Sequence, residues 1–132
     1  MNNSKLWWSI ALIWCFAIAI ATRQPFFTGD STKQLLLNPF FDSAILNYVL
    51  RKATHLTAFG LLALFLWLAL RGSQYRYFIA WLLASIYGAI DEWHQSFLPN
   101  RSALVTDVLI DSLGAFLMLI FIYWINKRKT IK

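Results

Sequence analysis

Acidic residues are scarce in this chain of 132 residues, which has six of them against twelve lysines and arginines. With a single cysteine, Cys15, the chain can form neither an internal disulfide nor a cysteine-based metal site. Charged residues of either sign make up 14% of the chain, whereas about a quarter is usual in soluble domains. Apolar residues make up 59% of the chain, and the mean hydropathy of the whole chain is +0.55. This composition indicates one integral membrane domain covering residues 1–132.

Four apolar segments are long enough, or nearly so, to cross a bilayer core that needs about 20 helical residues. They cover residues 6–22, 55–70, 77–93 and 104–125. Tryptophan and tyrosine recur near their ends, as expected at a membrane interface. We therefore predict an all-α, polytopic membrane protein whose four spans form a transmembrane bundle. We interpret the first segment as a retained span and not as a cleaved signal peptide.

The link between the first two spans is the only long one, and it has an apolar pattern of its own. Asn38-Pro39 is typical of a helix start, since asparagine caps helices and proline fits the first helical position. Large apolar residues then recur at helical spacing through Val49. This pattern predicts a short amphipathic helix that lies on the outer surface of the membrane, after which the chain turns inward near Arg51.

The distribution of charge gives an expected orientation in a bacterial inner membrane. With both termini in the cytoplasm, seven basic residues lie on the cytoplasmic side and five on the outer side. All of the acidic residues then fall on the outer half: Asp30, Asp42, Asp91, Glu92, Asp107 and Asp111. The basic residues lie in loops and tails and form no basic amphipathic face, so we expect no nucleic-acid partner.

Two short stretches hold four of the carboxylates, and both flank apolar segments: Asp91-Glu92-Trp93-His94-Gln95 and Asp107-Val108-Leu109-Ile110-Asp111. A carboxylate at the centre of a membrane helix costs roughly 2.5–3.5 kcal/mol, so a chain that keeps several is expected to use them. Because successive spans alternate in direction, these stretches lie on the same side as the start of the second span. We predict a shared polar site, facing outward, that comprises Arg51, His55, Tyr87, Asp91, Glu92, His94, Gln95, Arg101, Asp107 and Asp111.

The order of these residues resembles that of the VanZ-like membrane protein family. The motifs are Arg-Lys-x-x-His-x-x-x-Phe-Gly from residue 51, Tyr-x-x-x-Asp-Glu-x-His-Gln-x-Phe-x-Pro-x-Arg-Ser from residue 87, and Asp-x-x-x-Asp-x-x-Gly from residue 107. The family takes its name from a protein linked to resistance toward teicoplanin, a lipid-tailed glycopeptide antibiotic. The resemblance implies a role at the cell envelope that bears on susceptibility to such antibiotics or on lipid-linked precursors.

Three interpretations of the polar site are open. In the first, it is a catalytic site acting on an anionic envelope lipid, with His94 or Glu92 as general base and Asp91 and Asp111 taking part. Its oxygen and nitrogen ligands would also suit a divalent metal ion. In the second, it binds such a lipid or a lipoglycopeptide without turnover. The binding residues would be Arg51, His55, Tyr87, Gln95, Arg101 and Asp107.

In the third interpretation, the charges neutralise each other and hold the bundle together, Arg51 with Asp91 and Arg101 with Asp107. Glu92 lies about 100° around the helix from Asp91, so we expect it to face water or lipid headgroups. Glycines at 60, 88 and 114 are expected to be points where helices pack closely, whichever interpretation holds.

Overall fold

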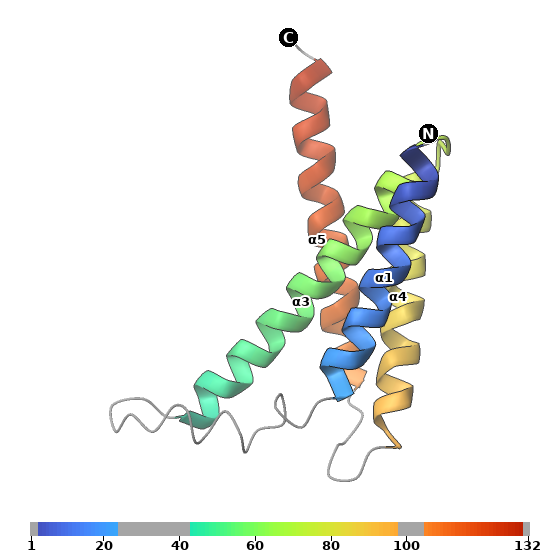
Figure 1. The fold of residues 1–132 in the computed structure, drawn as a ribbon. Coiled ribbons are helices and arrows are strands. Elements are labelled where there is room, and N and C mark those ends of the chain that lie inside the picture. Colours follow the sequence, from blue (N-terminus) through green and yellow to red (C-terminus); the bar gives the residue numbers. More distant parts are fainter. Residues whose placement is uncertain (1–2, 24–42, 98–104, 131–132) are drawn as a thin grey trace.

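A computed structural model describes residues 3–23, 43–97 and 105–130, and helices are the only regular secondary structure within these ranges (Figure 1). The helices are α1 (Asn3–Arg23), α3 (Ser43–Ala69), α4 (Arg76–Gln95) and α5 (Val105–Thr130). Figure 1 shows the N-terminal end of α1 and the C-terminal end of α5 at the same end of the molecule. The all-α fold class is thereby confirmed.

Three of these helices are long and apolar enough to cross a membrane. The qualifying stretches are Asn3–Thr22, Tyr48–Ala69 and Val105–Lys129. They match three of the four predicted spans, so the chain has the character of a polytopic membrane protein. Helix α4 corresponds to the remaining predicted span, but it carries Arg76, Asp91 and Glu92 within 20 residues and is less apolar.

Helix α3 is longer than the sequence analysis predicts. It runs without a break from Ser43 past Arg51 to Ala69, so the predicted inward turn near Arg51 is wrong. The physical reason is that no proline or glycine lies between Ser43 and Gly60 to interrupt the helical hydrogen bonds. The residues up to Val49 assigned to a separate surface helix are thus the first turns of α3, where they are described. Residues 38–42 of that predicted helix lie outside the described ranges.

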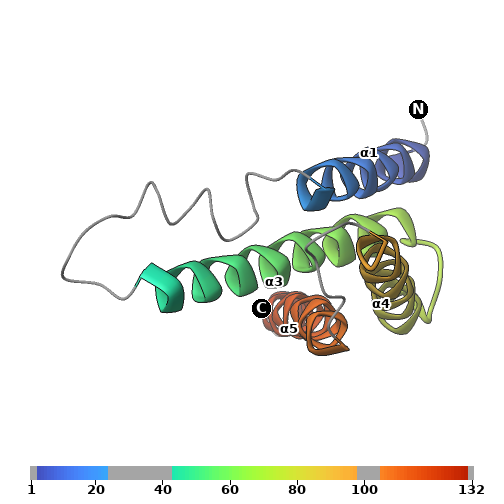
Figure 2. The ribbon, with the colours of Figure 1, turned by 90° about the horizontal axis from the view of Figure 1, so that it is seen from below.

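Helix α3 is the centre of the packing and contacts α1, α4 and α5. Viewed from below, it passes between α1 on one side and α4 and α5 on the other (Figure 2). The largest apolar side chains that are completely buried, Phe59 and Leu62, both belong to α3. Around them lie mainly small residues, such as Ala63, Ala84 and Ala115, which allow the helices to approach closely.

Glycines mark the closest approaches, as the sequence predicts. At Gly114 of α5, a Cβ atom would overlap the backbone carbonyl of Leu56 on α3. A Cβ atom at Gly60 would lie 3.2 Å from the carbonyl oxygen of Gly114. A Cβ atom at Gly88 of α4 would lie 3.1 Å from the Asp111 Cβ. The α3–α5 crossing therefore depends on the absence of side chains at Gly60 and Gly114.

The outer surface of α4 is apolar, and its inner surface is small or polar. Its buried residues are Ala80, Ala84, Gly88, Asp91, Glu92 and Gln95. Its exposed side chains include Phe78, Leu82, Leu83, Ile86, Ile90 and Trp93. This distribution is the reverse of the one expected for a helix on a water-soluble protein.

Candidate functional site

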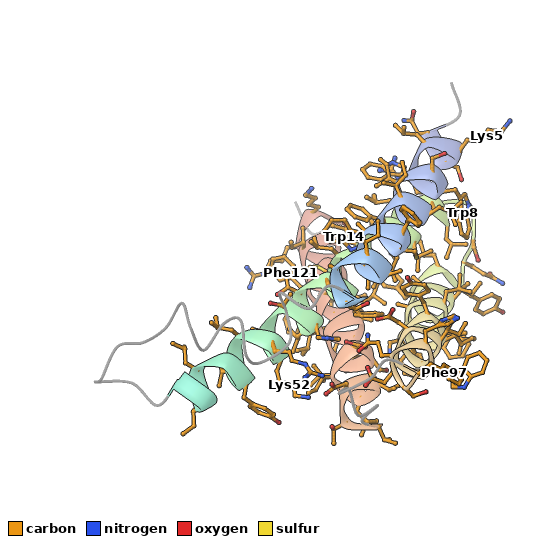
Figure 3. The ribbon with its side chains drawn as sticks, turned by 60° about the horizontal axis from the view of Figure 1, so that its bottom comes forward. Lys5, Trp8, Trp14, Lys52, Phe97 and Phe121 are labelled. Atoms are coloured by element: carbon orange, nitrogen blue, oxygen red, sulfur yellow. The ribbon has the colours of Figure 1, made fainter. Side chains whose placement is uncertain are left out.

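Six polar side chains are buried together at one end of the bundle, and none is more than 7% exposed. They are His55, Asp91, Glu92, Gln95, Asp107 and Asp111. With Arg51 and Lys52, which bond to Asp107, they form what we call the polar cluster. It lies where α1 and α4 end and α5 begins, opposite the end that carries Lys5 (Figure 3). The structure therefore brings together residues of α3, α4 and α5 that the sequence places in one site.

Helices α3 and α5 are joined by charged contacts. Arg51 donates from its Nη2 to Asp107 Oδ2 at 3.0 Å, and Lys52 donates to the other oxygen of Asp107. One turn further along, His55 Nδ1 lies 3.0 Å from Asp111 Oδ1. Because Asp107 and Asp111 are four residues apart, they meet residues 51 and 55, which have the same spacing on α3.

The third interpretation of the site paired Arg51 with Asp91, but Arg51 is paired with Asp107, so that pairing is wrong. The close crossing of α3 and α5 at their glycines makes the carboxylates of α5 the nearest ones to Arg51. The expected pair of Arg101 with Asp107 lies outside the described residues, as does Arg101 itself. Within the described residues, each carboxylate oxygen of Asp107 accepts from a different α3 cation.

Asp91 is held by neutral partners from two helices. Gln95 donates from Nε2 to Asp91 Oδ2 at 2.7 Å, and Thr22 of α1 donates to Asp91 Oδ1 at 3.2 Å. Thr22 was not among the predicted site residues. Its signal in the sequence is weak, since it is one hydroxyl at the end of the first apolar segment.

Glu92 is buried, at 3% exposure, so the expectation that it faces water or headgroups is wrong. The buried positions near the end of α4 are 88, 91, 92 and 95. This is the i, i+3, i+4, i+7 pattern of a helix face that is wide enough to include both Asp91 and Glu92.

Two predicted residues have contacts outside the polar cluster. His94 is exposed, with its ring 5.6 Å from the ring of Trp93. Tyr87 packs against Phe59 and donates its hydroxyl to the carbonyl of Cys15 at 2.5 Å. Tyr87 thus connects α4 to α1, and His94 faces outward from α4.

The described residues contain no group of three or more His, Cys, Asp or Glu side chains arranged to hold a metal ion. The carboxylates of Asp107, Asp111 and Asp91 are instead directed at basic or neutral side chains. In this part of the chain the donor set therefore does not fit a divalent cation.

A cavity of about 230 Å³ lies between α1 and α3 next to the polar cluster. Its apolar lining includes Trp14, Ala17, Ile18, Ala58 and Phe59, and its polar lining consists of Thr22, Arg51, Thr54 and His55. The Trp14 ring is held in this wall by a hydrogen bond that its Nε1 donates to the Ala58 carbonyl at 2.9 Å. The cavity thus combines apolar walls with one guanidinium and one imidazole.

Polar atoms without a hydrogen-bond partner among the described residues include one on Arg51 and one on Gln95. These two are Nε of Arg51, a donor, and Oε1 of Gln95, an acceptor, and both are buried. A buried polar atom without a partner is costly, at about 1–3 kcal/mol, so such atoms are natural points for a ligand to bind.

Apolar outer surfaces, three helices able to cross a membrane and a buried polar cluster at one end define a polytopic helical membrane protein. Residues 4–126 match the VanZ/LLP1 family, and the chain belongs to this family. The resemblance seen in the sequence motifs is thereby confirmed. No curated protein and no solved structure matches the chain.

Proposed function

We propose that this protein binds an anionic amphiphile of the cell envelope, either a membrane lipid or a lipid-linked precursor, at the polar cluster. The observation that supports this function is the cavity between α1 and α3, with apolar walls and Arg51 and His55 in its lining. A guanidinium suits a phosphate or carboxylate, and the apolar walls suit hydrocarbon. At about 230 Å³, the cavity is smaller than the roughly 300–1,000 Å³ of sites for whole small ligands, so it takes a segment of an acyl or prenyl chain.

The cluster holds four carboxylates, but none of them is among the described residues that line the cavity, where Arg51 and His55 lie. Asp107 is matched by Arg51 and Lys52, and Asp111 by His55. Arg51 retains a donor at Nε and is 31% exposed at its side chain, whereas Asp107 is 1% exposed. An approaching headgroup therefore meets the cation before the carboxylate behind it.

In this proposal the bundle spans the bacterial inner membrane four times. Helix α4 has 20 residues, which gives about 30 Å, the thickness of a bilayer core. Its exposed apolar side chains support contact with lipid. The basic end of α5, with Lys127, Arg128 and Lys129, supports a cytoplasmic location for both termini. The polar cluster then faces the outer leaflet, where envelope precursors and glycopeptides are found.

The physiological role we propose is to lower susceptibility to lipid-tailed glycopeptides such as teicoplanin, through the lipid bound at the cluster. Membership of the VanZ/LLP1 family supports this role through the family's name. Cells that produce Arg51→Gln should therefore have the teicoplanin susceptibility of cells without the protein. Equal protection by Arg51→Gln and the unchanged protein would contradict the role.

The binding proposal is tested by native mass spectrometry of the full chain, titrated with a polyprenyl phosphate and with the uncharged polyprenol. Ala17→Phe fills the cavity wall and should abolish retention of both compounds. Ala89→Phe makes the same change on the exposed surface of α4 and serves as the control. Arg51→Gln should weaken binding of the phosphate and leave the alcohol unchanged. Equal binding of the phosphate by all three variants would refute the proposal.

A catalytic function is the second candidate, supported by the contact between His55 and Asp111. Asp111 holds the Nδ1 side of the ring, so Nε2 is the nitrogen left for a reacting group at the cavity. This assigns the general-base role to His55, with Asp111 orienting it, in place of Glu92 or the exposed His94. Mass spectrometry of the incubated polyprenyl phosphate separates the candidates. A product that forms with the unchanged protein and not with His55→Asn favours catalysis, and binding without product favours the first candidate.

A further inference from the structure

A second groove lies between α4 and α5, toward the opposite end of the bundle from the polar cluster. Its volume is about 590 Å³, and eight residues line it: Tyr77, Phe78, Trp81, Phe116, Leu119, Ile120, Tyr123 and Trp124. Figure 1 shows α5 leaning away from α3 beyond their crossing, toward the end where both termini lie. No residue of this groove belongs to the polar cluster, so the groove is a separate feature of the molecule.

The groove has the dimensions of one lipid chain in one leaflet. From Phe116 to Trp124 its wall follows α5 for about 12 Å, compared with the roughly 15 Å of half a bilayer core. Phe78, Phe116 and Trp124 are 60%, 50% and 58% exposed, so these rings are not covered by the rest of the chain as described. The walls are apolar and aromatic, which suits hydrocarbon.

Basic residues stand at the open end of the groove. Lys127 lies one helical turn after Tyr123, and Arg128 lies one turn after Trp124, so both continue the groove-lining side of α5. Across the groove, Arg76 precedes Tyr77 at the start of α4 and lies over the ring of Trp67 at 4.3 Å. Asn126 donates to the Tyr77 hydroxyl at 3.2 Å, which brings the end of α5 to the start of α4.

From this arrangement we propose that the groove between α4 and α5 is a binding site for an anionic phospholipid. One acyl chain lies along the aromatic walls, and the phosphate contacts Lys127, Arg128 and Arg76. Along the groove, the apolar residues come first and the basic residues come last. This order matches a phospholipid in one leaflet, with its acyl chains in the membrane core and its headgroup at the surface. The charge at the open end selects acidic over zwitterionic headgroups, because a basic residue near the headgroup layer adds about 1 kcal/mol of attraction to an anionic lipid.

The test is native mass spectrometry of the delipidated full chain in detergent, titrated with phosphatidylglycerol or phosphatidylcholine of the same acyl chains. We expect tighter binding of phosphatidylglycerol, and a loss of about fivefold in affinity for each charge removed in Lys127→Gln and Arg128→Gln. Lys5→Gln removes a charge at the same end of the bundle but on α1, and should leave the affinity unchanged.

The acyl-chain part of the site has a matched pair of variants on α5. Trp124→Ala removes a groove wall and should weaken binding of both lipids, whereas Phe121→Ala removes a ring of similar exposure, 61%, that does not line the groove. Equal affinity for the two phospholipids, or the same loss in Lys5→Gln as in Lys127→Gln, would overturn the proposal. So would a dimer that Trp124→Ala dissociates in the absence of lipid, since a second copy would then occupy the groove. None of these variants touches the polar cluster, so this result is independent of the proposed function.

Discussion

Replacing Gly114 by alanine should damage both the stability of the bundle and the geometry of the polar cluster. A Cβ atom at this position would lie 2.9 Å from the backbone carbon and the Cα of Leu56, and closer still to the carbonyl oxygen. Carbon atoms in contact prefer about 3.5–4.0 Å, and the carbonyl oxygen is the tightest contact, so the two helices must separate by about 1 Å. Backbone atoms cannot turn aside as a flexible side chain can, so α3 and α5 must move as whole helices.

The expected cost follows from this separation. Overpacking a tight contact costs about 1–3 kcal/mol, and alanine returns up to ~1 kcal/mol through its higher helix propensity. His55 and Asp111 are 3.0 Å apart across the same pair of helices, as are Arg51 and Asp107. An added separation close to 1 Å takes both contacts beyond the 3.2 Å of an ordinary hydrogen bond. With the weakened contacts included, we therefore expect the free energy of unfolding to fall by about 1–3 kcal/mol and ligand binding at the cluster to weaken.

The measurement is reversible unfolding in mixed detergent micelles, followed by circular dichroism. Gly72→Ala is the control, since a Cβ atom there meets nothing within 4 Å. Gly60→Ala should give an intermediate loss, because its Cβ would lie 3.2 Å from the Gly114 carbonyl oxygen. If Gly114→Ala and Gly72→Ala unfold at the same denaturant concentration, the close crossing of α3 and α5 is refuted.

Three further predictions concern single contacts. Asp107→Asn should lower the free energy of unfolding by about 2–3 kcal/mol, because it leaves Arg51 and Lys52 without a carboxylate; adding Arg51→Gln should recover part of the loss in a double-mutant cycle. Tyr87→Phe should cost about 1 kcal/mol through the lost hydrogen bond to Cys15, and an unchanged unfolding curve would contradict that bond. His94→Ala should change the free energy of unfolding by less than about 0.5 kcal/mol because the side chain is exposed. His55→Ala should lower it by more than about 1 kcal/mol because that side chain is buried. Equal effects would count against the different placement of the two histidines.

The composition and periodicity of the sequence were enough to predict the helical class and the gathering of charges at one end. The i, i+4 spacing of Asp107 and Asp111 identified a helix face, and the alternation of spans brought it to the level of Arg51 and His55. Both inferences rest on geometry that is local to one helix or common to all membrane bundles.

The partners within the cluster could not be predicted, because they depend on how the helices pack. Arg51 meets Asp107 and not Asp91 because Gly60 and Gly114 allow α3 and α5 to cross closely. The hydroxyl of Thr22 reaches Asp91 only because α1 ends beside α4. Such contacts are set by tertiary structure, and no spacing within one helix encodes them.

The pairing of α3 with α5 has a consequence for the order in which the protein is made. Synthesis proceeds from the N-terminus, so α3 and α4 emerge from the ribosome before α5. Until α5 follows, Arg51, Lys52 and His55 lack the carboxylates that hold them in the finished bundle. The nascent hairpin of α3 and α4 therefore carries these side chains without their partners until the last helix arrives.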